Sequence, residues 1–168
     1  MVHFAVDDSE VAFCTHLTGK DSWFLPFNQG WNDGAGNPPN PDGLKTDYLW
    51  KQILAKESLG IIIENFAQIV EEEDEKGKKK RKQIFPRFHQ LRTVRALLRR
   101  CRVEGVGRRY LIQHSAGSGK SNTIPWPAHQ LVDLPQYNDA KSPPVDAVVA
   151  HPRRRPPARQ LSPPNKGP

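Results

Sequence analysis

The chain has 168 residues, a formal net charge of +7 and 36% hydrophobic residues, which is enough for one modest domain or for parts of two. No apolar run is long enough to cross a bilayer, and the first nine residues lack the basic start and apolar stretch of a signal peptide. Only two cysteines are present, far apart in sequence, so we expect a cytoplasmic protein with free thiols and no membrane partner.

The distribution of proline divides the chain into an N-terminal part that can form regular structure and an irregular C-terminal part. Eleven of the 16 prolines lie from Pro125 onward. Because proline lacks a backbone N–H, a segment this rich in it cannot form regular hydrogen-bonded structure. We expect residues 135–168, which are also rich in arginine, to be irregular or disordered.

The first part of the chain has the pattern of a small β-structure. Two apolar runs, Val2 to Val6 and Val11 to Thr15, flank a polar four-residue stretch and predict a β-hairpin. Strand-like composition continues from Trp23 to Phe27. The following segment, Asn28 to Gly43, is dense in Gly, Asn and Pro and predicts an irregular loop.

Two helices and a charged segment are expected next. Thr46 is a plausible N-cap for a first helix, and Ser58 for a second helix from Leu59 to Val70. An acidic block, Glu71 to Glu75, then meets a basic block, Lys76 to Lys82. Adjacent charge blocks are typical of a solvated linker, so residues 71–83 are interpreted as a linker and a domain boundary.

From Phe85 the pattern predicts another helix, opened by Pro86 and ended by Gly105 and Gly107. Its apolar residues recur at helical spacing: Phe88, Leu91, Val94, Leu98 and Cys101. A further helix is expected after Ser121 and through Leu131. Pro127 should cost that helix about 3 kcal/mol or break it, since proline removes an N–H donor and crowds the preceding turn.

The strongest local signal lies between these helices. A strand-like stretch, Arg109 to Gln113, is followed by His114-Ser115-Ala116-Gly117-Ser118-Gly119-Lys120-Ser121. This order matches a phosphate-binding loop, in which consecutive backbone N–H groups and the start of the next helix surround phosphates. His114 stands where the usual pattern has its first glycine. His89, by contrast, is interpreted as a packing or surface residue.

Two runs together carry a family resemblance. Phe85-Pro86-Arg87-Phe88-His89-Gln90, the arginine-rich helix after it, and Leu111 to Ser121 resemble the restriction (R) subunit of type I restriction-modification enzymes. These enzymes are ATP-dependent DNA translocases of helicase superfamily 2, joined to a nuclease domain. In that family the first loop position is also commonly His. The resemblance extends nearly continuously from Val2 to Leu134 and decays beyond it.

The resemblance implies the fold class and a domain division. It implies an α/β chain in which a P-loop domain of RecA type begins after the α+β tail of a nuclease-like region. Residues 1–70 would belong to that tail and its connecting helices. Residues 71–83 would be the linker, 84–134 the start of the motor domain, and 135–168 an irregular or degraded motor segment.

The resemblance also implies a nucleotide site for ATP and Mg²⁺. Gln90 would contact adenine, Lys120 would reach the β- and γ-phosphates, and the Ser121 hydroxyl would bind Mg²⁺. The loop residues that would cradle the phosphates are Ser115, Ala116, Gly117, Ser118 and Gly119. In the intact family the partners are double-stranded DNA and the methylation and specificity subunits.

The expected activity is limited by what the sequence lacks. After Lys120 it contains no Walker B acidic pair to hold Mg²⁺ and orient water. We therefore expect a fragment that keeps an ATP-binding loop and is catalytically inactive. The alternatives are a small basic nucleic-acid-binding or interaction protein without nucleotide chemistry, and a self-sufficient small P-loop ATPase or kinase. The missing Walker B pair argues against the ATPase or kinase.

Overall fold

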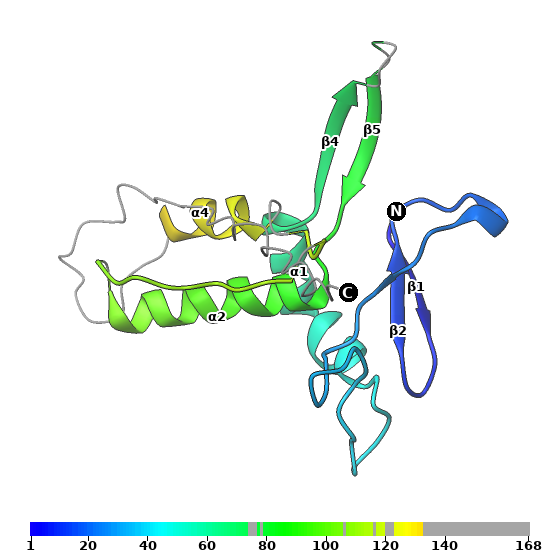
Figure 1. The fold of residues 1–168 in the computed structure, drawn as a ribbon, viewed down its shortest axis with the longest axis horizontal. Coiled ribbons are helices and arrows are strands. Elements are labelled where there is room, and N and C mark those ends of the chain that lie inside the picture. The colour runs from blue at the N-terminus through cyan, green and yellow to red at the C-terminus, as the bar shows by residue number, and fades with distance from the viewer. Residues whose placement is uncertain (74–76, 78, 106, 116, 120–122, 133–168) are drawn as a thin grey trace, which may run out of the picture.

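The computed structural model describes residues 1–73, 77, 79–105, 107–115, 117–119 and 123–132. Over these residues the chain is a mixed α/β structure with two small antiparallel sheets and several helices (Figure 1). None of the described helices is long and apolar enough to cross a membrane. The predicted tail, residues 135–168, lies outside the described residues.

The predicted N-terminal hairpin is confirmed. Strand β1 (His3–Val6) pairs antiparallel with β2 (Val11–Cys14), with Val6 opposite Val11 at the turn. Asp7 stabilises the turn, since its carboxylate accepts hydrogen bonds from the backbone of Ser9 and Glu10 at 2.7 and 2.8 Å. The expected third strand is reduced to β3 (Leu25–Pro26), which pairs with β2.

The segment after β3 is an irregular loop, as its composition predicts, and it is followed by a short π-helical turn, η2 (Leu49–Ile53). A 3₁₀ turn, η1 (Gly19–Asp21), precedes β3. Thr46 does not cap η2 with its side chain, contrary to prediction. Its hydroxyl instead donates a hydrogen bond to the Asp7 carbonyl at 2.8 Å, which ties this segment to the β1–β2 turn.

Helix α1 (Lys56–Asn65) is shorter than predicted. It begins before Ser58 and ends at Asn65, so the expected helix from Leu59 to Val70 is wrong over its last five residues. Ser58 lies inside the helix and does not cap it; its hydroxyl accepts a hydrogen bond from Arg95 at 2.7 Å. The chain leaves the helix at Phe66, where Ile69 and Val70 favour the extended conformation that follows.

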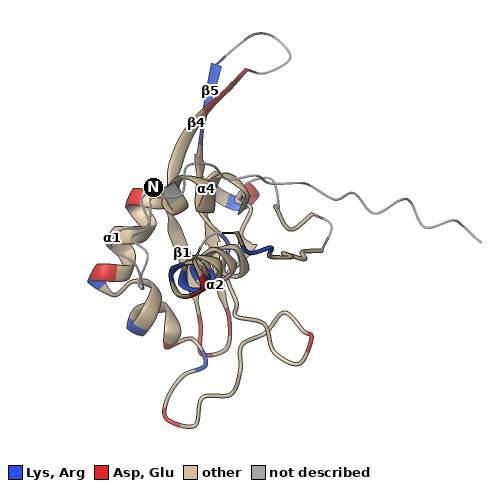
Figure 2. Cartoon of the chain, turned by 90° about the vertical axis from the view of Figure 1, so that its left-hand side faces the viewer, with Lys and Arg blue, Asp and Glu red and all other residues tan. Residues whose placement is uncertain are grey.

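The charged segment is a hairpin rather than an irregular linker. Strand β4 (Gln68–Glu73) pairs antiparallel with β5 (Lys79–Ile84), and the pair projects away from the rest of the chain (Figure 1). The register sets each glutamate of β4 opposite a lysine or arginine of β5, and Figure 2 shows the two charge signs on adjacent strands. Arg81 contacts Glu71 at 3.0 Å and Lys82 approaches Glu72 at 3.7 Å. Two blocks of opposite charge therefore become favourable cross-strand neighbours.

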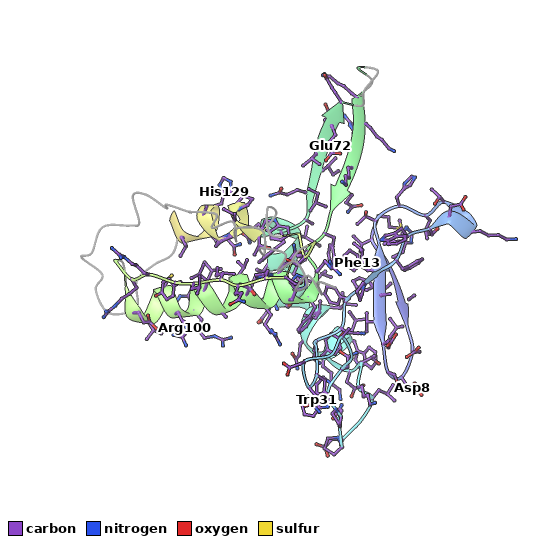
Figure 3. The ribbon with its side chains drawn as sticks, in the orientation of Figure 1. Asp8, Phe13, Trp31, Glu72, Arg100 and His129 are labelled. Atoms are coloured by element: carbon purple, nitrogen blue, oxygen red, sulfur yellow. The ribbon has the colours of Figure 1, made fainter. Side chains whose placement is uncertain are left out.

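Helix α2 (Phe88–Glu104) is confirmed as the long helix after Phe85, and Gly105 ends it with φ of +74°. Its first turns are buried in an aromatic cluster that contains Phe4, Phe13, Phe27, Phe85 and Phe88. Phe13 points from the sheet toward this cluster (Figure 3). This core joins residues from both sides of the β4–β5 hairpin. The domain boundary at 71–83 stays a prediction.

Helix α4 (Pro125–Val132) contains Pro127, the proline that was expected to weaken or break the helix, and the predicted break does not occur. The helix starts at Pro125, so Pro127 lies in its first turn. N–H groups there have no acceptor within the helix, and proline therefore removes no hydrogen bond. Trp126 is buried against Phe66, with ring centroids 5.5 Å apart, and the helix packs on α2.

Truncating the centre of the aromatic cluster should destabilise the whole fold. Phe27 is fully buried and contacts several other rings, so Phe27→Ala should lower the free energy of unfolding by about 3–5 kcal/mol, measured by urea denaturation. Trp23→Ala is the matched control, because Trp23 is 78% exposed and its loss should cost less than about 0.5 kcal/mol. Equal losses in the two variants would contradict this core.

Candidate nucleotide-binding loop

The loop of the predicted phosphate motif makes a tight turn over its described residues. Gly117 and Gly119 have φ of +72° and +77°, values that residues with a side chain rarely adopt. The Ser118 N–H donates to the Ser115 carbonyl at 3.4 Å. Ser118 is buried, whereas Ser115, Gly117 and Gly119 are exposed. Alternating left-handed glycines of this kind let backbone N–H groups gather on one side of a loop.

The first turn of α2 holds this loop through Gln90. The Gln90 side chain is only 3% exposed and uses both ends of its amide. Its Nε2 donates to the Gly119 carbonyl at 2.8 Å and to the Ser118 carbonyl at 3.3 Å, and its Oε1 accepts from the Arg87 N–H at 2.8 Å. Gln90 therefore connects the start of the helix to the loop 29 residues later.

His89 makes a second contact between the same two elements. Its Nε2 lies 3.1 Å from the Ser118 carbonyl oxygen, and its ring lies 5.3 Å from the ring of His114. Burial lowers the pKa of the His89 imidazole, the Ser118 carbonyl opposes this effect, and the charges of Arg87 and Arg92 add to it. The ring is therefore neutral at pH 7, and its single N–H at Nε2 would donate to Ser118.

Two buried side-chain donors of these segments lack a partner among the described residues. They are the Arg87 Nε and the Ser118 hydroxyl. An unpaired buried donor is costly in free energy, so such groups are usually satisfied by water or by a bound molecule. Both belong to the two elements that Gln90 joins.

The structure describes only some of the predicted site residues. Gly117, Ser118 and Gly119 form the turn, and Ser115 precedes it. Ala116, Lys120 and Ser121 lie outside the described residues. Gln90 lies against the loop, where its amide is occupied by backbone groups. Its predicted contact with adenine stays a prediction.

The strand predicted before the loop is not formed. Residues 107–115 contain no strand, and the segment from Arg109 to His114 lines a groove of about 500 Å³ along α2. Leu111 is 86% exposed, so it does not occupy a sheet interior. The apolar pattern of this segment is genuine, but a strand needs a neighbour to pair with, and the described residues provide none beside it.

His89 is the site residue that sequence reasoning missed. Adjacent residues on a helix point in directions about 100° apart, so Gln90 and His89 are not expected to reach the same loop. Only the tertiary arrangement shows that the loop passes across the helix start. Among the described residues, no group of three His, Cys, Asp or Glu side chains is placed to hold a metal ion.

Comparison of the chain with protein-family models, with curated proteins and with solved structures finds no match. The membership of the type I restriction family therefore stays a prediction from the sequence motifs.

The packing of Gln90 on Gly119 gives a testable consequence for the loop. A Cβ added at Gly119 would lie 2.7 Å from the Gln90 Nε2, whereas a Cβ at Gly117 would meet nothing within 4 Å. The two glycines have similar positive φ, so Gly119→Ala should lower the free energy of unfolding by about 1 kcal/mol more than Gly117→Ala, measured by chemical denaturation. In a Gln90→Ala background this difference should disappear. If it persists, Gln90 does not pack against Gly119.

Proposed function

We propose that the loop from His114 to Ser121 binds ATP together with Mg²⁺, in a chain related to the R subunit of type I restriction enzymes. The observation that carries the proposal is the contact of Gln90 with Ser118 and Gly119. The family resemblance pairs a glutamine with a phosphate loop about thirty residues later, and the fold brings these two features together.

The described part of the loop fits a triphosphate. The Ser118 and Gly119 carbonyls are bonded to α2, so a phosphate approaching the exposed side of the loop would not meet these two oxygens. Helix α4 follows the loop along the chain, beginning at Pro125.

Roles for the remaining residues come from the motif. Lys120 would neutralise the β- and γ-phosphates, and Ser121 would be the protein ligand of Mg²⁺. Backbone N–H groups of Ser115, Ala116, Gly117, Ser118 and Gly119 would surround the phosphates. Gln90 would turn toward adenine only by releasing its present backbone contacts.

The proposed site binds ATP without hydrolysing it efficiently. Hydrolysis in this class of motor needs a Walker B acidic pair, and the residues after Lys120 contain none. DNA translocation and cleavage, with double-stranded DNA and the methylation and specificity subunits as partners, are proposed only for the intact enzyme.

Binding of a fluorescent ATP analogue in the presence of Mg²⁺ tests the proposal. Lys120→Ala should weaken binding by at least about tenfold, because it removes the charge that faces the phosphates. Lys20→Ala is the matched control, since Lys20 is an exposed lysine of η1 in another part of the chain, and it should bind like the wild type.

Two results would contradict the proposal. One is a wild-type chain that is folded by circular dichroism but does not bind the analogue. The other is ATP hydrolysis by this chain alone at a rate abolished by Lys120→Ala, which would indicate a self-sufficient ATPase.

A second candidate function, binding of nucleic acid, is favoured by arginines near the end of α2. Arg99 and Arg102 lie one turn apart on the helix, and Arg108 and Arg109 follow it; all four are exposed. None of them forms an ion pair within the described part of the chain, whereas Arg81 and Lys82 of the hairpin contact glutamates. The free arginines therefore suit phosphates better than the basic hairpin strand does.

Salt dependence distinguishes this candidate. If α2 contacts the DNA backbone, Arg99→Gln combined with Arg102→Gln should weaken binding to duplex DNA and reduce the slope of log K against log salt by roughly two. Arg81→Gln combined with Lys82→Gln is the control, and its slope should change less. Equal slopes for the wild type and the α2 variant would exclude this surface.

A further inference from the structure

Two successive carbonyl groups of the loop face the first turn of α2. The Ser118 carbonyl lies 3.1 Å from the His89 Nε2 and 3.3 Å from the Gln90 Nε2, and the Gly119 carbonyl accepts from Gln90 at 2.8 Å. Two adjacent helix residues therefore determine the orientation of consecutive peptide groups in the loop.

The orientation of a carbonyl determines that of the next N–H. In a trans peptide the C=O and the following N–H point in opposite directions within one plane. Because the Ser118 carbonyl points toward α2, the Gly119 N–H points away from the helix, toward the exposed side of the loop. Within the described part of the chain, no group accepts a hydrogen bond from that N–H.

We infer that His89 is a positioning residue of the phosphate-binding loop: by donating from Nε2 to the Ser118 carbonyl, it holds the Gly119 N–H toward the side on which phosphate binds. This inference rests on the proposed function, because the phosphate is that of the ATP bound there. It assigns to His89 a role distinct from that of Gln90, whose amide is predicted to contact adenine.

The surroundings of His89 suit a fixed neutral donor. The ring is half-buried and packs against His114, which opens the loop, and the cationic groups that face it are Arg87 and Arg92. These features disfavour a second proton on the ring, so its one N–H stays available for the carbonyl. When Gln90 turns to a base, the His89 contact would keep the Ser118 peptide in place.

The test compares two substitutions at His89 with a matched histidine elsewhere. His89→Phe keeps a ring for packing but removes the donor, and it should weaken binding of the fluorescent ATP analogue by about tenfold, the effect of one lost hydrogen bond. His89→Gln keeps an N–H of similar reach and should bind within about threefold of the wild type. His129→Phe is the control, because His129 is an exposed residue of α4 (Figure 3), and it should not change binding.

A readout at the loop separates positioning from general stability. In amide NMR spectra, inorganic triphosphate should shift the Gly119 N–H resonance of the wild type and of His89→Gln, and shift it less in His89→Phe. The thermal unfolding midpoints of His89→Phe and His89→Gln should agree. Equal analogue affinity and equal Gly119 shifts in His89→Phe and the wild type would overturn the inference while leaving the ATP site intact.

Failure of the proposed function has a different signature. A wild-type chain that binds no ATP analogue overturns that function. The His89 contact is then tested by the NMR chemical shifts of its imidazole nitrogens. A neutral ring protonated at Nε2 supports the hydrogen bond from His89 to the Ser118 carbonyl. A ring that exchanges between both tautomers overturns it.

Discussion

The aromatic rings packed around the start of α2 hold together parts of the chain that are far apart in sequence. Phe13 comes from the N-terminal sheet, Phe27 from the loop after it, and Phe85 and Phe88 from the entry to the helix. Their edge-to-face contacts bury large apolar surfaces and fix the position of the helix start relative to the sheet. The location of every polar group on that first helical turn follows from this packing.

The candidate site depends on the same helix start. Once Phe88 is buried, the two residues after it are placed at the edge of the core, and the loop near residue 118 passes across them. A half-buried histidine and a buried glutamine then hydrogen-bond to loop carbonyls in surroundings that exclude much of the water, where such bonds are stronger than at the surface. The loop thus obtains its shape from the aromatic core as well as from its own glycines.

The charged hairpin and the first turn of α4 show how context changes the meaning of local composition. Glutamates followed by lysines are typical of a solvated linker, but the antiparallel register makes them cross-strand pairs. Pro127 reads as a helix breaker, but it is harmless where the helix begins two residues earlier. In both cases the outcome depends on where an element starts or which strand it faces, and neither is encoded at a single position.

Local pattern alone was sufficient for the β1–β2 hairpin, the irregular loop after β3 and the long amphipathic α2, because period and turn chemistry act over a few residues. The absence of a strand before the loop, the end of α1 at Asn65 and the contact of His89 with Ser118 were decided by the tertiary structure. Each of these depends on whether a neighbour distant in sequence is present to pair, pack or accept a hydrogen bond. The residue types determine which chemistry is possible, and only the packing around α2 determines which of those residues come into contact.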